Sequence, residues 1–389
     1  MTTAPTTTAP APAATRVVPV QTRSERPRST DPADFATPTG REVDWKLSPV
    51  ERLAPLFEDA PGDGSARWTI DAPEPVRVGT LAAGQSPRGS VFEPEDRPSA
   101  IAFARTAQAH HVLLPEAAAL ERPIVVSVEG GGAESRETAH LVLEAAAGSV
   151  GTVVLRHEGS TRLAENVEIV VGAGAALTVI AVQQWADDAL HASAHQARLA
   201  EGASLRHVVV TFGGGVVRVN PSVDLAGARS EAEMYGVSYA DAGQHFESQV
   251  YVFHHGPETR ADVLYKGALQ GVGARSVWIG DVLIGPEATG TDSYEANRNL
   301  VLTDGARADS IPNLEIETGD IAGAGHASAT GRFDDEQLFY LQARGVPEAE
   351  AKRLVVLGFL AEIAQRIPVE SLQEELIAAI EAELAKEVV

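Results

Sequence analysis

The sequence predicts a mainly β protein built around a parallel, right-handed β-helix, with a short N-terminal helical region and a C-terminal helical subdomain. Three observations support this fold class. From Val112 onward, short branched strands follow one another with glycine-containing corners and no long helix between them. Glycine is abundant, at 35 residues, while aromatics make up only 5% of the chain, which favours thin stacked layers over a bulky core. Beyond Asp334 the apolar pattern becomes helical.

The composition divides the chain into four parts. The Thr/Ala/Pro-rich segment 1–39 is expected to be a disordered tail, and it lacks the apolar run of a secretory signal. Segment 40–110 is expected to be a mixed, partly helical region, segment 111–330 the β-helix core, and segment 331–389 the helical domain. No apolar run reaches the length of a membrane span, so a cytoplasmic location is expected.

The first helix is expected just before the β-helix core. Ser48 is suited to be its N-cap, and Glu51 follows three residues later as a capping-box acid. Leu53, Leu56 and Phe57 would then form the buried face of this short helix.

The β-helix core is predicted from strands and corners that recur without a strict repeat. Representative strands are 124–128, 153–156, 167–171 and 177–182. Corners are marked by Gly-Ala pairs at 174–175, 202–203, 227–228, 273–274 and 305–306. Glycine supplies the positive φ that a tight corner needs, and each coil buries its apolar face by stacking on its neighbours. A doubly wound sheet would need a helix after every strand, whereas a sandwich or jelly roll stays open as an alternative.

The end of the chain predicts three helices separated by breakers. Gly345 would end the first helix, Pro347 would begin the second, and Pro368 would end it. The third helix carries an apolar stripe of leucines and isoleucine at four-residue spacing from Leu372 to Leu384. This arrangement predicts a packed helical subdomain, part of whose surface docks another protein.

Several function classes are excluded or disfavoured by composition and motifs. A formal net charge of −23 argues against binding to nucleic acid or anionic lipid. The chain has no cysteine, so it forms no disulfide and holds no all-thiolate cluster. It also lacks a P-loop, a G-x-S-x-G elbow and an H-E-x-x-H motif, so no enzymatic activity and no cofactor bound by this chain alone are expected. A β-helix carbohydrate-active enzyme is the enzymatic alternative.

Histidines are the candidate metal ligands. The pairs His110-His111 and His254-His255 are adjacent, and adjacent side chains of a strand point to opposite faces, so neither pair chelates one ion. His191 and His195 are four residues apart and could share a face, but no further ligand is evident beside them.

His326 stands out because it lies at the junction between the strand pattern and the helices. Gly325 and Ala327 flank it, so its imidazole would be little crowded. Two readings are open from the residues alone: a functional imidazole, or a hydrogen-bonded histidine that closes the last coil.

Four sequence blocks resemble the SufB/SufD family of iron–sulfur cluster assembly scaffolds. Segment 308–316, ADSIPNLEI, is similar to the family's D-S-x-P-x-L-E-I signature. Segment 325–330, GHASAT, followed by DEQLFY at 335–340, is similar to its H-x-A-T and D-E-Q-L-F-Y block. Segment 269–281 resembles its late β-helix coils, and segment 295–302 resembles its Q/N-x-N-L strand.

The resemblance implies a SufD-like scaffold subunit rather than a SufB-like one, because SufB-type subunits carry a functional cysteine near the end of the β-helix. Some SufD members have a cysteine where this chain has Ala324. The implied partners are a SufB-like subunit at the end of the β-helix and a SufC-like ABC ATPase on the C-terminal helices. His326 is the one residue carried over, as a possible ligand to iron or a nascent cluster in the complex. A purely structural bracing subunit without metal contact is the second alternative.

Overall fold

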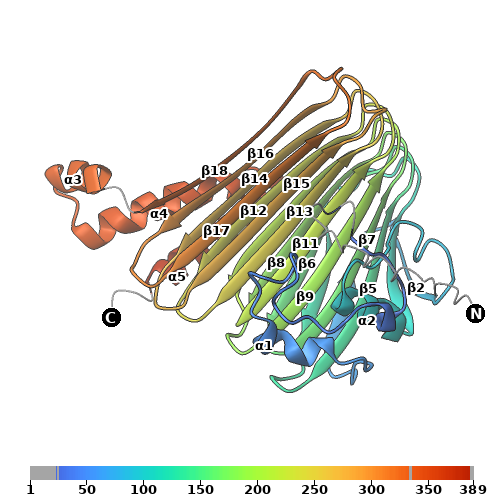
Figure 1. Ribbon diagram of the computed structural model, residues 1–389, viewed down its shortest axis with the longest axis horizontal. Coiled ribbons are helices and arrows are strands. Elements are labelled where there is room, and N and C mark those ends of the chain that lie inside the picture. Colours follow the sequence, from blue (N-terminus) through green and yellow to red (C-terminus); the bar gives the residue numbers. More distant parts are fainter. Residues whose placement is uncertain (1–22, 24–25, 333–334, 386–389) are drawn as a thin grey trace, which may run out of the picture.

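The computed structural model describes residue 23 and residues 26–332 and 335–385, and it shows a β-helix flattened into two nine-stranded sheets (Figure 1). Sheet A consists, in spatial order, of β1 (Arg67–Asp71), β4 (Ile124–Glu129), β6 (Val150–Gly159), β8 (Ala176–Trp185), β10 (Ser204–Gly213), β12 (Glu231–Ala240), β14 (Arg260–Leu269), β16 (Asp292–Val301) and β18 (Gly323–Arg332). Sheet B consists of β17 (Arg307–Ile316), β15 (Arg275–Ile284), β13 (His245–His254), β11 (Val216–Leu225), β9 (Leu190–Leu199), β7 (Arg162–Val171), β5 (Arg136–Ala145), β3 (Gln108–Leu114) and β2 (Arg77–Ala82).

The chain alternates between the two sheets, so each strand pairs in parallel with the strand one coil before and one coil after it. Arg260 of β14, for example, pairs with Glu231 of β12 and with Asp292 of β16. The exceptions are the pairs β1–β4 and β2–β3, which are antiparallel and end the sheets at the N-terminal side. The predicted parallel β-helix is confirmed.

The main core fills the space between the two sheets. Side chains alternate along each strand, so one set points inward and the other outward. Inward valines and leucines such as Leu155, Val179 and Val263 are fully buried in one continuous cluster. Burying such a side chain contributes about 1.5–3 kcal/mol relative to leaving it exposed, so the stacked coils stabilise one another.

Most predicted corners use glycine with a positive φ. Four do so, with φ between +63° and +87°: Gly174, Gly202, Gly273 and Gly305. The corner at Gly227 differs, because its positive φ of +57° belongs to Arg229. Gly227 is needed there for another reason, since a Cβ would collide with the backbone of Ala200 and Glu201 in the coil below.

The N-terminal region covers the outer face of sheet B. It contains η2 (Pro32–Asp34), α1 (Val50–Leu53), η3 (Ala54–Phe57) and α2 (Arg97–Arg105). Leu53, Leu56 and Phe57 are buried with Trp45 against this sheet, as predicted. The predicted cap is wrong: Pro49 is the N-cap of α1, and the Ser48 hydroxyl donates instead to Glu247 at 2.7 Å.

Order begins earlier than predicted. The tail expected over 1–39 lies partly outside the described residues, but Arg23 and residues 26–39 are placed against sheet B. Arg23 Nη1 donates to the carbonyl of Gln249 at 2.7 Å, and Arg26 Nη1 donates to its Oε1 at 3.0 Å. Phe35 is buried. These contacts join residues more than 200 positions apart, which composition does not reveal.

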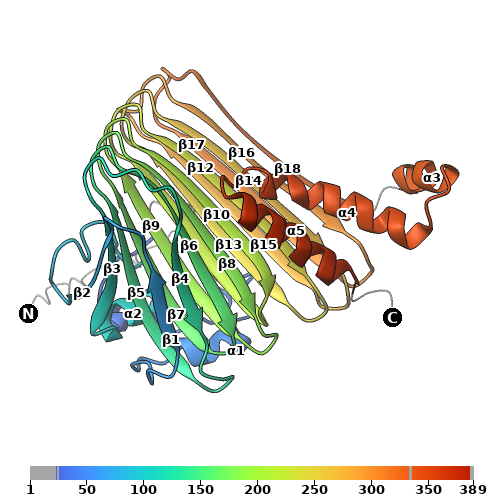
Figure 2. The ribbon, with the colours of Figure 1, turned by 180° about the vertical axis from the view of Figure 1, so that it is seen from behind.

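The C-terminal helices are α3 (Asp335–Ala343), α4 (Glu348–Ala364) and α5 (Glu370–Ala385). Figure 2 shows α4 and α5 lying across the outer face of sheet A, while α3 projects past the end of the β-helix. The contact buries a second apolar cluster that includes Leu360, Ile363, Leu376 and Ile380. Across the described residues, none of the helices combines the length and apolarity that a membrane crossing requires.

Candidate functional site

The predicted site residue His326 lies in β18, the last strand of sheet A. It pairs in register with Glu295 of β16, so both side chains point to the same face of the sheet. His326 Nδ1 is 3.9 Å from Glu295 Oε1. The imidazole is 44% exposed, whereas the carboxylate is 1% exposed. The structure therefore places an accessible imidazole directly above a buried carboxylate.

Glu295 is unusual because, among the residues that the structure describes, neither of its carboxylate oxygens has a hydrogen-bond partner. Burial, with a smaller contribution from Asp281, raises its pKa to about 8. A buried carboxylate without partners is costly, because it loses hydration and gains nothing in return. This cost suggests that Glu295 binds a ligand or contacts a partner protein that would offset it.

The space that the Glu295 carboxylate occupies exists because the residue facing it is a glycine. Gly280 of the facing sheet lies against the carboxylate, and a Cβ at this position would overlap both Glu295 and the ring of Trp278. The neighbouring inward positions are also polar: Asn297 accepts hydrogen bonds from Ser310 and from Asn299. The last coils are thus lined by polar side chains next to Glu295.

The end of the β-helix beside His326 is open. In the part of the chain that the structure describes, β17 pairs only with β15 and β18 pairs only with β16, so each has one strand edge without a neighbour. Such edges present unpaired backbone groups that can accept another strand.

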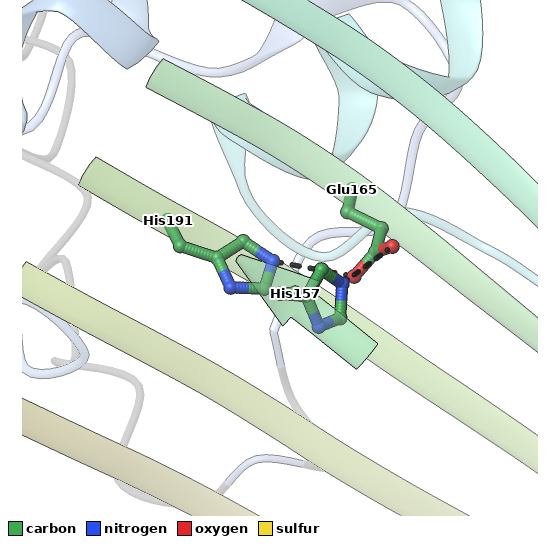
Figure 3. A group of neighbouring side chains, drawn as sticks. All are labelled: His157, Glu165 and His191. Atoms are coloured by element: carbon green, nitrogen blue, oxygen red, sulfur yellow. Dashed lines mark hydrogen bonds and ion pairs between the residues drawn. The ribbon is translucent and has the colours of Figure 1, made fainter. Parts of the chain in front are cut away.

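A second group of polar side chains lies inside the β-helix. Figure 3 shows His157 of β6, Glu165 of β7 and His191 of β9 pointing toward one another. Their potential ligand atoms all lie within 4.8 Å of one another, and all three side chains are fully buried. Each histidine Nε2 is 3.2 Å from a different oxygen of Glu165.

The hydrogen-bond partners of His157 and His191 determine which ring nitrogens carry protons. Trp185 can only donate, so its Nε1–H at 3.2 Å makes Nδ1 of His191 an acceptor and places the His191 proton on Nε2. Nδ1 of His157 is 3.2 Å from the carbonyl of Val182, which can only accept. His191 therefore donates to Glu165 through its Nε2–H. Because Nδ1–H of His157 faces the Val182 carbonyl, His157 donates to Glu165 through Nε2 as the doubly protonated imidazolium. Burial alone would raise the pKa of Glu165, but His157 and His191 hold that pKa well below its usual range.

The protonated Nε2 of His191 has no lone pair for a cation, so these three residues as arranged form a buried ion-pair network rather than a metal centre. The network continues along the interior. Ser193 donates to Glu165 at 2.9 Å, and His195 Nε2 donates to the Ser193 hydroxyl at 2.9 Å. His195 Nδ1 then accepts from His207 Nε2 at 2.8 Å.

The structure also places the other histidines that the sequence singles out. His191 and His195 do share the inward face of β9, but each contacts different partners and they do not converge on one point. The adjacent pairs do point apart. His254 is buried, whereas His255 is 55% exposed.

Sequence reasoning missed Glu295 and the interior network. The signal for Glu295 was its position exactly one coil before His326, which a repeat-based register would have given. His157, Glu165 and His191 lie on three different strands, the first two 8 positions apart and the last two 26 positions apart, so no short motif connects them.

Comparison with known proteins gives the family. The family model described as SUF system FeS cluster assembly, SufBD core domain, matches residues 128–359. The chain is 48% identical over 357 residues to an iron–sulfur cluster assembly SufBD family protein of Mycobacterium bovis, covering 90% of each chain. It is 46% identical to one of Mycobacterium leprae, covering 90% of this chain and 91% of the relative.

A more distant iron–sulfur cluster assembly SufBD family protein, from Mycobacterium tuberculosis, is 29% identical over 204 residues, which is 52% of this chain and 24% of that protein. These matches give no support to the carbohydrate-active alternative. The β-helix, its open polar end and the matched core domain agree on one conclusion: the chain belongs to the SufBD family of iron–sulfur cluster assembly proteins.

Proposed function

We propose that this chain is the SufD-type scaffold subunit of a cytoplasmic Suf complex, that it pairs with a SufB-type subunit, and that it docks a SufC-type ABC ATPase. The observation that carries the proposal is the open terminal coil, where two unpaired strand edges flank an accessible imidazole. The absence of cysteine favours a SufD-type role, because sulfur then has to be carried by the partner.

The pairing with the SufB-type subunit would use the edges of β17 and β18. Parallel edges of two β-helices match in strand spacing, so pairing would extend both sheets across the interface. His326 would then lie at this interface and supply an imidazole to iron, for which it is a suitable ligand.

Docking of the ATPase would use the C-terminal helices. Helix α3 projects past the β-helix, and its Phe339 and Tyr340 are 72% and 56% exposed. Exposed aromatics on a projecting helix are typical anchors of a protein interface. The chain carries no P-loop of its own, so nucleotide hydrolysis would come from the partner and this subunit would not be an enzyme.

The proposal is tested by co-expressing the full chain with SufB-type and SufC-type subunits from the same source and measuring the mass of the assembly. A stable complex containing all three chains is expected, and a chain that stays alone would overturn the proposal. In the reconstituted complex, His326→Ala is expected to reduce cluster assembly, with His255→Ala as the exposed-histidine control. Normal assembly by His326→Ala would instead favour the bracing subunit without metal contact.

A further inference from the structure

Glu295 is the buried polar group that the proposed function leaves unexplained. Apart from His326, no basic side chain forms an ion pair with it among the described residues. Its two oxygens lack hydrogen-bond partners, although the group is 1% exposed. Leaving a buried polar group unsatisfied costs about 1–3 kcal/mol, and more when the group is charged.

The position of the carboxylate fits a cation site shared with His326. Ligand atoms lie about 2.0–2.2 Å from a bound divalent transition ion, so two ligands of one ion are about 3.0–4.2 Å apart. The 3.9 Å between His326 Nδ1 and Glu295 Oε1 falls within this range. Imidazole and carboxylate together suit divalent first-row ions such as ferrous iron.

The packing keeps the site in this form. Gly280 leaves the space that the carboxylate occupies, and a side chain there would displace it. The strand register fixes Glu295 directly beneath His326. The imidazole side of the site faces the open end of the β-helix, so the remaining coordination positions would be open to water or to a partner subunit.

We propose that Glu295 is a metal ligand, and that Glu295 and His326 together form a two-residue site for a divalent transition ion at the open end of the β-helix. The inference rests on the proposed function in one respect, that the ion carried in the cell is the ferrous iron used for cluster assembly. It adds a buried carboxyl ligand, which loses its proton when the ion binds and which His326 alone would not provide.

The test uses the untagged full-length chain alone, titrated with Co²⁺ by calorimetry and by visible absorption. We expect one site whose affinity falls by roughly ten-fold or more in both His326→Ala and Glu295→Gln, since ligand loss costs at least as much as the loss of a supporting contact. Glu287→Gln, which changes an exposed carboxylate in the loop before β16, is expected to bind as the wild type does. Thermal unfolding of each variant shows that it is folded.

Two results would overturn the proposal. The first is wild-type Co²⁺ affinity in Glu295→Gln while His326→Ala loses the site, which would leave His326 as the only ligand. The second is a wild-type chain with no more Co²⁺ bound than the Glu295→Gln/His326→Ala double variant. Because the titration needs no partner, failure to assemble with SufB-type and SufC-type subunits is a separate result that bears on the proposed function alone.

Discussion

Trp185 donates its indole proton to Nδ1 of His191 inside the β-helix, with 3.2 Å between the two nitrogens. This one bond decides the role of the neighbouring carboxylate. It places the His191 proton on Nε2, from which it is donated to Glu165, and so makes the group an ion-pair network.

Replacing this donor is expected to destabilise the fold. Trp185→Phe removes the indole N–H and leaves a buried acceptor on His191 without a partner, which costs about 1–3 kcal/mol beyond the loss of ring volume. Trp278→Phe is the matched control, because Trp278 is similarly buried and its Nε1 has no hydrogen-bond partner in the part of the chain that the structure describes. Urea unfolding of both variants measures the difference. Equal losses of free energy would show that the bond to His191 contributes nothing.

Attachment of the N-terminal region to sheet B is expected to depend on Arg218. Its guanidinium is 2.6 Å from Asp96 and 3.1 Å from Glu247, and it lies 4.0 Å from the centre of the Trp45 ring. Burial alone would raise the pKa of Glu247, but Arg218, with smaller contributions from neighbouring groups, holds it at about 2. Arg218→Met would leave two buried carboxylates without the guanidinium that they share, at a cost of about 3–5 kcal/mol.

Arg206→Met is the control for this prediction, because Arg206 pairs with Glu233 on the surface, where both side chains are partly exposed. Such a pair contributes about 0–1 kcal/mol. Comparison of the two urea midpoints checks the prediction, and similar midpoints would contradict it.

The coils and helices could be predicted because they depend on local chemistry. The corners at Gly174 and Gly202 need a positive φ, and Pro347 and Pro368 interrupt helices wherever they occur. The corner at Gly227 could not be predicted correctly from local chemistry. There Arg229 adopts the positive φ, and glycine is required because a side chain would collide with the backbone of the preceding coil.

The parts that escaped prediction depend on contacts between distant coils. Arg23 is ordered by the carbonyl of Gln249, and the proton on His191 is set by Trp185, which lies in the other sheet. His326 is a candidate from the sequence alone because its sequence block is distinctive. Glu295 was not found, because a carboxylate in a strand is ordinary until the register places it beneath an imidazole.

The buried histidines predict a loss of stability on mild acidification. Burial lowers the pKa of His254 to about 3, far below its ordinary value of 6.5. As the pH falls below about 6.5, His254 becomes protonated in the unfolded chain but stays neutral in the folded chain. The free energy of unfolding therefore decreases. Each such group contributes up to about 1.4 kcal/mol per pH unit.

His254→Asn removes one of these groups and is expected to reduce the slope of unfolding free energy against pH between pH 6 and 5. Carboxyl groups with raised pKa values, such as Glu295, contribute equally to the wild-type chain and the variant, so the difference between the two slopes reports on His254. The wild-type chain gives the reference slope. Urea unfolding at several pH values gives both slopes, and an unchanged slope in His254→Asn would refute the assignment.

In the C-terminal helices, buried residues are expected to determine the stability of the fold, and exposed residues of α3 are expected to determine docking of the ATPase. Helix α4 is fixed to sheet A by Lys266, which donates to the Phe359 carbonyl at 2.9 Å, and α5 buries Leu376 in the shared apolar cluster. Leu376→Ala is therefore expected to cost about 2–5 kcal/mol. Phe339 and Tyr340 of α3 are exposed, so their replacement by alanine should change the unfolding free energy by no more than about 0.5 kcal/mol.

The same alanine pair is expected to abolish co-purification with the SufC-type ATPase, because two exposed aromatics would be the anchors of that interface. Lys352→Ala on α4, which removes an exposed ion pair with Glu348, is the control and should retain the partner. Unfolding measurements on the lone chain and pull-down from the co-expressed complex test the two parts separately. Retention of the ATPase by the Phe339→Ala/Tyr340→Ala variant would place the docking surface elsewhere, on the faces of α4 and α5 that sheet A leaves uncovered.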